Sequence, residues 1–306
     1  IWLDYIRRDI LDNGTLARYI NELSVTGLTS NPSIFDKAIA DTELYDEEIK
    51  SLRAGGTTDR EEIFFTLAIQ DLQRAAGLFR TTWDVSGATD GCCSLEVSPL
   101  LANDTNSTIE QGASLFARAA TPNLMIKVPG TPEGAPAIEE LISRGININV
   151  TLLFSEAQYR RAAEAYIKGL ERRAEAGESL KVFSVASVFV SRWDKAAMND
   201  LPDDLKDRLG VAASVQCWRA SLEIFSGPRW EALAAKGATP QKLLFASTST
   251  KDPALPDTYY VSALAADGTV NTIPEKTLLA FADHGEVTGT LDQASITEAD
   301  DIIARC

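Results

Sequence analysis

Short apolar runs alternate along this chain with longer amphipathic stretches, and this alternation limits the fold more than any other feature of the sequence. It is typical of βα units arranged around a parallel sheet. We predict strands at residues 1–4, 25–29, 92–97, 124–128, 146–153, 181–187, 243–247 and 259–264. We predict helices at residues 16–23, 61–79, 107–119, 133–143, 155–176, 205–225 and 274–281. Eight βα units in 306 residues predict an α/β protein, a single (β/α)8 TIM barrel with extra helices.

We expect residues 1–306 to form one barrel domain, because no Ser/Gly-rich linker, low-complexity tract or internal repeat divides the chain. Both ends lie inside predicted elements. The chain opens directly on the strand at residues 1–4 and stops at Cys306, within an acidic helical stretch that begins near Thr297. We therefore expect the native termini, or a further module such as a fused second enzyme, to lie beyond these residues.

The charge of the chain excludes several classes of partner. The sequence has 29 Lys and Arg against 44 Asp and Glu, a formal net charge of −15. Such a chain does not bind nucleic acid or anionic lipid through bulk charge, so an anionic ligand needs a local positive site. No apolar run reaches the ~18 residues of a membrane span. We expect a soluble, cytoplasmic protein with small-molecule partners, and the sequence leaves homo-oligomerisation open.

Neither cysteine nor histidine indicates a metal site. The adjacent pair Cys92-Cys93 lacks C-x-x-C spacing, and four cysteines are too few for a disulfide framework, so we expect packed thiols in a reducing compartment. The single histidine, His284, is interpreted as a surface residue at a helix end rather than as a base. We expect no metal and no cofactor.

A predicted strand carries polar residues on one face. Residues 146–151 alternate strictly, so Asn147, Asn149 and Thr151 share one side and three aliphatic residues share the other. In an antiparallel sandwich such a row would face solvent. Between helices, a polar barrel lumen explains the row equally well, and a polar lumen is usually a binding site.

Three ionisable residues lie at strand ends, where TIM-barrel enzymes place their catalytic groups. Lys127 ends the fourth strand, Glu96 the third and Asp4 the first. A lysine among apolar neighbours is shifted toward its neutral amine, which can attack a carbonyl to form a Schiff base. Taken singly, the lysine could snorkel to solvent, and each acid could be an N-cap or an ion-pair partner. The three complementary groups together favour a catalytic site.

Two cations follow the late strands, each beside hydroxyl residues. Arg192 comes after the sixth strand and Lys251 after the seventh. Loops after the late strands of TIM barrels often bind phosphate, which guanidinium, ammonium and hydroxyl groups recognise. Solvated surface cations are the alternative interpretation.

Three segments carry a resemblance to a known family. Residues 26–35 (TGLTSNPSIF) closely resemble the T-(T/S)-N-P-S signature of transaldolases, residues 126–131 (IKVPGT) resemble their lysine motif, and residues 148–155 (INVTLLFS) resemble their N-x-T-L-L-F-S segment. The motifs fall in the family's order and at family-like separations, from residue 1 to about residue 281.

The resemblance implies a (β/α)8 class I aldolase that moves a dihydroxyacetone unit between sugar phosphates in the pentose phosphate pathway. It implies that Lys127 is the Schiff-base lysine and that Asp4 acts at the C4 hydroxyl. Glu96 is implied as the acid/base that works through a water near Thr151.

The resemblance also implies residues that bind the substrate. Asn31 and Asn149 correspond to amides that hold the dihydroxyacetone hydroxyls, Ser187 and Ser247 to late-strand serines, and Arg192 to a phosphate-binding arginine. This chain departs from the family where many members have a second arginine, since Ser249 occupies that position. We expect Lys251 to replace that missing cation as a point charge.

Two alternatives to transfer remain open. A fructose-6-phosphate aldolase would release free dihydroxyacetone, but those relatives are shorter and lack the strand-three glutamate that Glu96 resembles. A non-catalytic sugar-phosphate-binding barrel would keep the phosphate loops but would have no use for a buried lysine between two acids.

Overall fold

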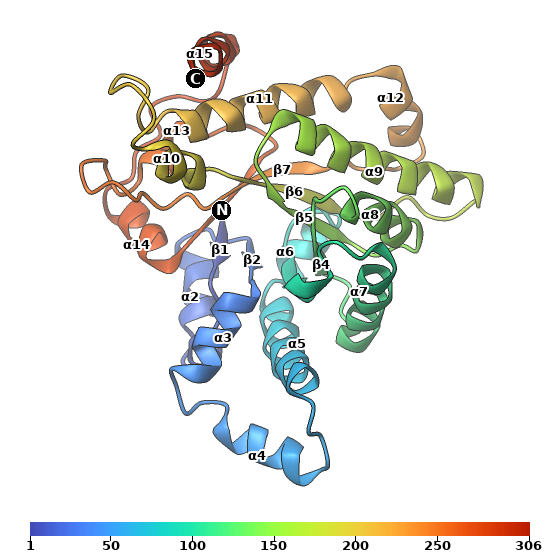
Figure 1. The fold of residues 1–306 in the computed structure, drawn as a ribbon. Coiled ribbons are helices and arrows are strands. Elements are labelled where there is room, and N and C mark those ends of the chain that lie inside the picture. Colours follow the sequence, from blue (N-terminus) through green and yellow to red (C-terminus); the bar gives the residue numbers. More distant parts are fainter.

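A computed structural model describes all residues from Ile1 to Cys306. Eight parallel strands pair in sequence order and close into a barrel, in which β1 pairs with both β2 and β8 (Figure 1). This confirms the predicted (β/α)8 class. The strands are β1 (Trp2–Asp4), β2 (Gly27–Thr29), β3 (Cys93–Glu96), β4 (Leu124–Pro129), β5 (Ile148–Leu153), β6 (Ser184–Phe189), β7 (Lys242–Ala246) and β8 (Val270–Ile273).

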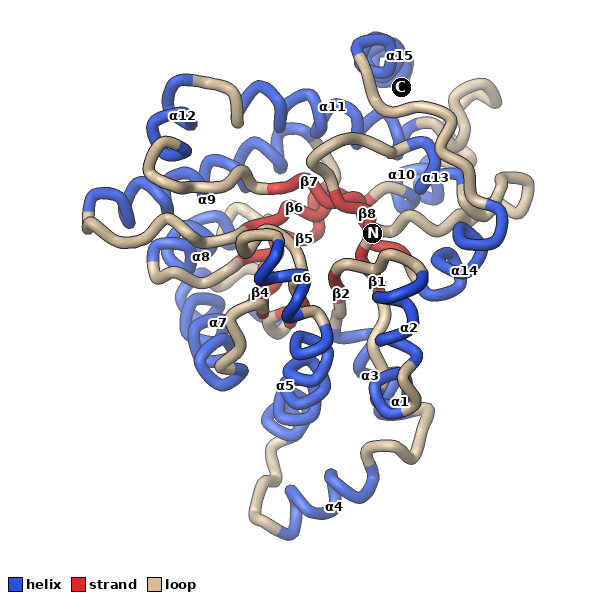
Figure 2. The backbone as a smooth tube through the Cα atoms, turned by 180° about the vertical axis from the view of Figure 1, so that it is seen from behind, coloured by secondary structure: helices blue, strands red, loops and turns tan.

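Helices surround the barrel in both views of the backbone (Figure 2). Seven of them correspond to the predicted helices: α2 (Thr15–Glu22), α5 (Arg60–Leu78), α7 (Thr105–Ala119), α8 (Gly134–Ser143), α9 (Glu156–Glu175), α11 (Leu209–Ile224) and α14 (Glu275–His284). The other helical elements are α1 (Arg8–Asp12), α3 (Pro32–Ala40), α4 (Asp46–Ala54), α6 (Arg80–Val85), the 3-10 turn η1 (Pro99–Leu101), α10 (Ser191–Ala197), α12 (Pro228–Ala234), α13 (Tyr259–Ala263) and α15 (Gln293–Arg305). No helix is both long and apolar enough to cross a membrane.

The prediction for the eighth strand was wrong. Five of these six predicted residues, Tyr259–Ala263, form α13 instead, and β8 follows at Val270–Ile273. Aromatic and β-branched residues favour a strand locally, but packing overrides that preference. The Tyr260 hydroxyl donates to Asp194 Oδ2 at 2.8 Å, and Val261 is buried. The true strand escaped notice because it has only four residues, two of which are polar.

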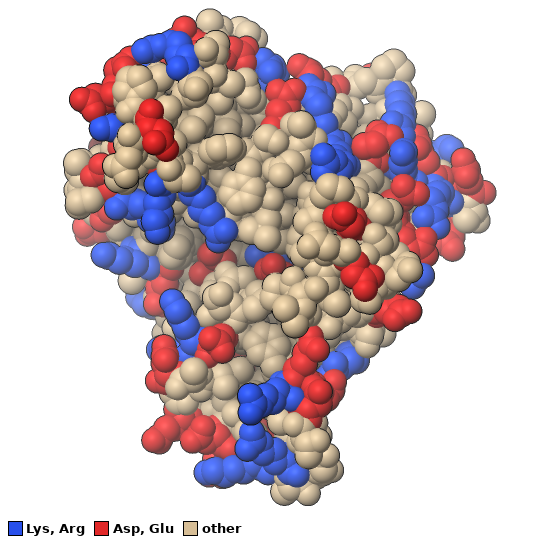
Figure 3. All heavy atoms as spheres, viewed as in Figure 1, with Lys and Arg blue, Asp and Glu red and all other residues tan.

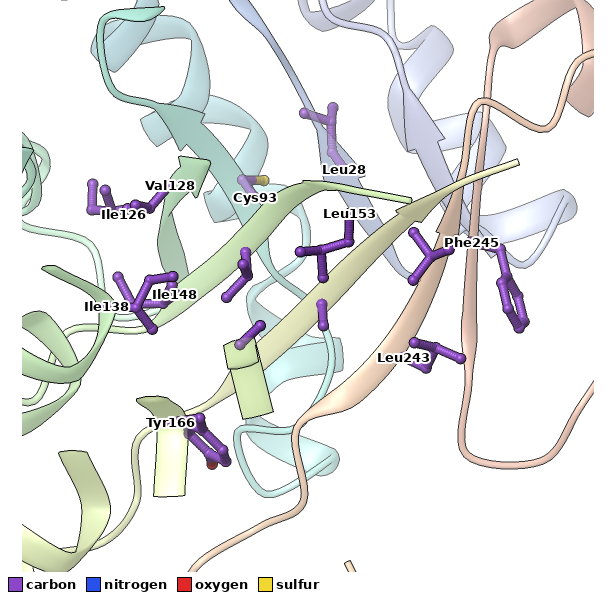
Figure 4. Packing of buried hydrophobic residues seen from close by; sticks show 14 of the residues in the cluster. Leu28, Cys93, Ile126, Val128, Ile138, Ile148, Leu153, Tyr166, Leu243 and Phe245 are labelled. Atoms are coloured by element: carbon purple, nitrogen blue, oxygen red, sulfur yellow. The ribbon is translucent and has the colours of Figure 1, made fainter. Parts of the chain in front are cut away.

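The outer faces of the strands pack against the helices. Sixty buried residues form this main hydrophobic cluster. Leu28, Ile126 and Ile148 belong to this cluster and point outward from β2, β4 and β5, and Ile138 of α8 lies beside Ile126 and Ile148 (Figure 4). Completely burying such a side chain contributes about 2 kcal/mol. The strands therefore present their alternate residues to the lumen.

The lumen has a separate apolar cluster, which we call the lumen plug: Trp2, Cys92, Met125, Phe183, Val185, Phe189, Leu244, Ala246 and Val270. Trp83 of α6 packs against it from outside the barrel. Gly27 makes room for the Trp2 indole, since a Cβ at position 27 would lie 2.5 Å from that ring. Most of the plug comes from the amino-terminal halves of the strands, so the polar lumen residues lie toward the carboxyl ends.

Helix α4 stands away from the barrel between α3 and α5 (Figure 1). A buried carboxylate on α5, Asp71, accepts hydrogen bonds from Arg8 Nε of α1 at 3.0 Å and from the Tyr45 hydroxyl at 2.8 Å. Arg8 also pairs with Glu48 of α4 at 2.7 Å and lies over the Tyr45 ring. Burial raises the pKa of Asp71. These contacts attach α4 to the barrel wall.

Candidate active site

A polar cavity of about 180 Å³ lies at the carboxyl ends of the strands. Seven of the predicted site residues line it: Asp4, Asn31, Lys127, Ser187, Arg192, Ser247 and Lys251. The three others, Glu96, Asn149 and Thr151, are buried nearby on β3 and β5. The barrel thus gathers groups that the sequence spreads over almost 250 residues.

Lys127 and Glu96 are paired by strand register, because they are direct partners on the adjacent strands β4 and β3. Lys127 Nζ lies 3.2 Å from Glu96 Oε2 and donates to the Ser30 carbonyl, also at 3.2 Å. Lys127 is 5% exposed and Glu96 8%. We predicted apolar neighbours for this lysine, but the structure places two oxygen acceptors beside its amine. A proton can therefore pass directly between Lys127 and Glu96.

Asp4 accepts a hydrogen bond at the end of a chain of hydroxyls. Thr29 Oγ1 donates to Asp4 Oδ1 at 2.7 Å, so the Thr272 hydroxyl, 2.6 Å from Thr29 Oγ1, is left to donate to Thr29. Burial raises the pKa of Asp4, and the charges of Lys127 and Arg192 and the Thr29 hydrogen bond oppose that effect. The resulting carboxylate is a stronger proton acceptor than an ordinary aspartate.

Amide and hydroxyl groups fill the lumen beside the lysine. Asn149 Nδ2 donates to Ser94 Oγ at 3.1 Å, and Ser187 Oγ donates to Asn149 Oδ1 at 2.7 Å. Asn149 therefore lies between β3 and β6, which confirms that the polar face of β5 is turned into the lumen. Asn31 caps α3, because its Oδ1 accepts from the Ile34 N–H at 3.0 Å. That bond leaves the Asn31 NH2 group free to donate to a ligand.

The strand after Thr151 is irregular. The β5–β6 register shifts between Val150 and Leu153, and Leu152 has a φ of 60°. Such strained bulges are common beside functional sites, where they redirect a side chain. Thr151 is completely buried, and its Oγ1 has no hydrogen-bond partner in the protein. This hydroxyl therefore has unused hydrogen-bonding capacity.

Cations gather at one end of the cavity. Arg192 and Lys251 line it, and Lys195 of α10 is close enough for its charge to lower the pKa of Lys251. Burial, Lys195 and Arg192 all lower the pKa of Lys251. Lys251 Nζ donates to Ser249 Oγ at 2.6 Å, and the Arg192 guanidinium lies 4.7 Å from the centre of the Phe189 ring.

Backbone contacts join the loops that carry these cations. The Ser191 N–H donates to the Ser247 carbonyl at 3.1 Å, and the two serine hydroxyls are 3.0 Å apart. Ser247 has a φ of 56°, a strained conformation for a serine. Basic side chains cluster on this face of the molecule beside the region of α10 (Figure 3). This cluster is the local positive site that an acidic protein needs to bind an anion.

Several site residues were missed by the sequence analysis. Thr29 lies within the TGLTSNPSIF motif, which predicts no role for it, and Thr272 lies on β8, which the sequence pattern placed at residues 259–264. Lys195 had no distinguishing context, because only the fold brings α10 beside the loop after β7. The three buried cysteines Cys92, Cys93 and Cys217 are free thiols in the core, as predicted, whereas Cys306 is exposed.

A (β/α)8 barrel with a buried amine that contacts one carboxylate and shares its cavity with a second has the architecture of an aldolase-type enzyme that works through lysine. Comparison with known proteins is more specific. The family model for transaldolase/fructose-6-phosphate aldolase matches residues 1–305. The transaldolase of Frankia alni is 44% identical and aligns with 99% of this chain and 84% of its own length. That of Acidothermus cellulolyticus is 45% identical over 94% of this chain and 79% of its own length. The chain therefore belongs to the transaldolase/fructose-6-phosphate aldolase family of enzymes.

Proposed function

We propose that this protein is a transaldolase that moves a dihydroxyacetone unit from fructose 6-phosphate or sedoheptulose 7-phosphate to an aldose phosphate. The observation that carries the proposal is the cavity itself, in which Lys127 contacts Glu96 and acts through its charge on Asp4, while Arg192 and Lys251 line the same cavity. One end can bind a phosphate and the other can react with a ketone. We infer that the reaction takes place in the cytoplasm, which the free thiols support.

The first step is attack of the Lys127 amine on C2 of the ketose. The C2 oxygen leaves as water once it has been protonated, and a C=N bond to Nζ replaces it. Glu96 is positioned to move these protons because it contacts Nζ. We propose that a water bound to the Thr151 hydroxyl carries these protons between Glu96 and the C2 oxygen.

The second step breaks the C3–C4 bond. Asp4 takes the proton of the C4 hydroxyl, C4 becomes an aldehyde carbon, and the electron pair of the broken bond enters the iminium to give an enamine on Lys127. The hydroxyl chain from Thr272 through Thr29 holds the Asp4 carboxylate in place. The enamine then attacks the aldehyde of the second sugar phosphate, and the steps run in reverse.

The remaining residues hold the substrate. Asn31 and Asn149 bind the hydroxyls of the dihydroxyacetone unit, and Ser187 orients the Asn149 amide. Arg192, Ser247 and Lys251 bind the phosphate, which supplies binding energy far from the reacting carbons. The positive charge of this subsite selects phosphorylated over neutral sugars.

Borohydride trapping tests the covalent step. Fructose 6-phosphate with borohydride should add a dihydroxyacetone-derived mass to the wild type but not to Lys127→Met, which should be inactive. An adduct that persists in the variant would overturn the assignment of Lys127. Transfer is distinguished from cleavage with erythrose 4-phosphate as acceptor: we expect sedoheptulose 7-phosphate, and free dihydroxyacetone as the main product would indicate an aldolase instead.

A further inference from the structure

Ser30 is a buried residue that has no part in the reaction described above, although its backbone meets the reactive lysine. Strand β2 ends at Thr29, and Ser30 is the first residue beyond it. Ser30 is 0% exposed, and its carbonyl accepts a hydrogen bond from Lys127 Nζ at 3.2 Å. This carbonyl is one of two acceptors beside the amine, the other being Glu96 Oε2.

The two acceptors differ in their chemistry. Glu96 has a carboxylate, which can take a proton from Nζ and return it. The Ser30 carbonyl belongs to a peptide group, which accepts a hydrogen bond but does not take the proton. The Ser30 carbonyl can therefore keep one N–H of Lys127 Nζ while Glu96 gains and loses a proton.

The side chain of Ser30 holds this carbonyl in place. Backbone pairing of β2 with β3 ends at Thr29 and Ser94, and the Ser30 hydroxyl extends the contact by donating to the Ser94 carbonyl at 2.7 Å. The next residue, Asn31, is extended, with φ −152° and ψ 165°, as is usual before a proline. The peptide group between Ser30 and Asn31 is thus held on one side by the Ser30 hydroxyl and on the other by the cap of α3.

We propose that Ser30 is a positioning residue for Lys127, an inference that rests on the proposed transaldolase reaction. The iminium that Lys127 forms with C2 of the ketose is planar and retains a single N–H on Nζ. That N–H lies in the plane of the C=N bond, so the carbonyl that accepts it also sets the orientation of the plane.

The orientation of this plane matters for the cleavage step. The electron pair of the C3–C4 bond enters the iminium when that bond stands nearly perpendicular to the plane, because the orbitals must be aligned. The Ser30 hydroxyl therefore acts on cleavage, through its own carbonyl and the lysine, more than on formation of the Schiff base.

Borohydride trapping with fructose 6-phosphate separates the two steps. It reduces the iminium of the intact six-carbon ketose, and also the iminium of the three-carbon unit, which forms when the enamine takes up a proton. Intact-protein mass spectrometry gives the ratio of the two adducts. In Ser30→Ala we expect the ratio of six-carbon to three-carbon adduct to rise about three- to tenfold, the effect of weakening one hydrogen bond. A purely structural loss would lower both adducts together and leave the ratio unchanged.

Ser184→Ala is the matched control. Ser184 is also 0% exposed, and its hydroxyl donates to the Ile148 carbonyl on the neighbouring strand at 2.8 Å, where β5 and β6 begin. Its removal should lower the unfolding free energy at least as much as Ser30→Ala does, because Gln241 also donates to this hydroxyl. It should leave the adduct ratio at the wild-type value.

Ser30→Cys provides a second variant at the same position. Its thiol is a weaker donor than a hydroxyl, so the ratio should rise in the same direction but by less than in Ser30→Ala. Should Ser30→Ala not fold, the comparison of Ser30→Cys with Ser184→Ala decides the question.

A ratio that rises in the Ser30 variants and not in Ser184→Ala supports the proposal. An unchanged ratio in the Ser30 variants, or an equal rise in Ser184→Ala, overturns it and leaves the proposed function intact. The absence of both adducts in the wild-type protein would instead overturn the proposed function, and this inference with it.

Discussion

Asp4 shows how a residue with a proposed catalytic role can oppose stability. Burial raises the pKa of Asp4 in the folded protein above its value in the unfolded chain, so the folded protein favours the protonated carboxyl. Asp4 therefore stabilises the fold only at low pH, and this stabilisation is lost as the pH rises through the folded-state pKa. Asp4→Asn should therefore raise the unfolding free energy at pH 7, by about 1 kcal/mol, and the gain should vanish in acid. The same variant should lose about 10² to 10⁴ in turnover. Denaturation at two pH values, together with a coupled assay, measures both effects.

Thr272→Val provides the matched control for Asp4. It removes the donor that orients Thr29, so the Asp4 carboxylate is less well stabilised and its pKa rises further. The acid limb of kcat/KM should move to higher pH while the plateau changes little. An acid limb that does not move would show that Asp4 does not set this part of the profile.

Single residues were predictable where their chemistry is unusual for their position. A lysine or carboxylate at the end of a buried strand is conspicuous, and so is the alternation around Asn149. Thr29 and Thr272 are ordinary strand residues, and their role depends on a 2.6 Å contact between residues 243 positions apart. No local pattern contains that information.

At the scale of the elements, the loops after β6 and β7 form one cationic unit. Lys251→Ala should raise KM for fructose 6-phosphate several-fold and change activity on unphosphorylated fructose little, because the lost contact is to phosphate. Arg192→Ala should be more severe, since a bidentate partner is lost. Equal damage to both substrates would show that Lys251 instead supports the loop.

The pH dependence of KM provides a further check on this unit. Because the pKa of Lys251 is lowered, its ammonium should lose its charge below the usual range for lysine, and KM for phosphorylated ketoses should rise there. Lys195→Ala removes one of the causes and should move this alkaline rise to higher pH. A rise that stays in place in Lys195→Ala would contradict the coupling between the two lysines.

The attachment of α4 depends on a buried charge. Arg8→Met leaves Asp71 buried without its cation, which should cost about 3 kcal/mol of unfolding free energy at pH 7. The loss should shrink as pH falls, because a protonated Asp71 needs no cation and its pKa is already raised by burial. Urea denaturation across pH measures this change, and the double variant Arg8→Met/Asp71→Asn should recover part of it. A loss independent of pH would contradict this account.

Among the helices, the longest were predictable and the shortest were not. The periodic patterns of α5, α9 and α11 span four turns or more, whereas α1, α6, α10, α12 and α13 have five to seven residues and are held by their neighbours. Residues 259–264 illustrate this, because their strand preference gives way to the contact of Tyr260 with Asp194. Packing between distant segments decides such short pieces.

For the whole molecule, the closure of the barrel could be inferred from the count of βα units, and the family motifs indicated which strand ends meet. Strand register could not be inferred. It makes Glu96 and Lys127 direct partners and thereby surrounds the amine with oxygen atoms rather than the apolar side chains we expected. A shift of one residue between β3 and β4 would turn the carboxylate away from the lumen.

The lumen plug bears on the fate of the enamine. A transferase must keep this intermediate until the second aldehyde arrives, whereas protonation at its C3 carbon followed by hydrolysis would lose it as free dihydroxyacetone. Met125→Ala should leave a gap in the lumen plug below Lys127 and so admit water. The ratio of dihydroxyacetone released to ketose formed should therefore rise. Its outward neighbour Ile126→Ala should lose a similar amount of stability, about 3 kcal/mol, without changing that ratio. Equal ratios in the two variants would contradict this role.

Trp2, Met125 and Leu244 fill the lumen on the amino-terminal side of Lys127. We therefore expect bulk water to reach the lysine through the cavity at the carboxyl ends of the strands, which is also where substrates would enter. The aldehyde product and the aldehyde acceptor must then pass through the same opening of the cavity, one after the other. While a sugar phosphate occupies that opening, it also excludes the water that would protonate and hydrolyse the enamine. The fraction of enamine that reacts with an acceptor rather than with water would thus depend on how long the opening stays unoccupied, and therefore on the concentration of the acceptor.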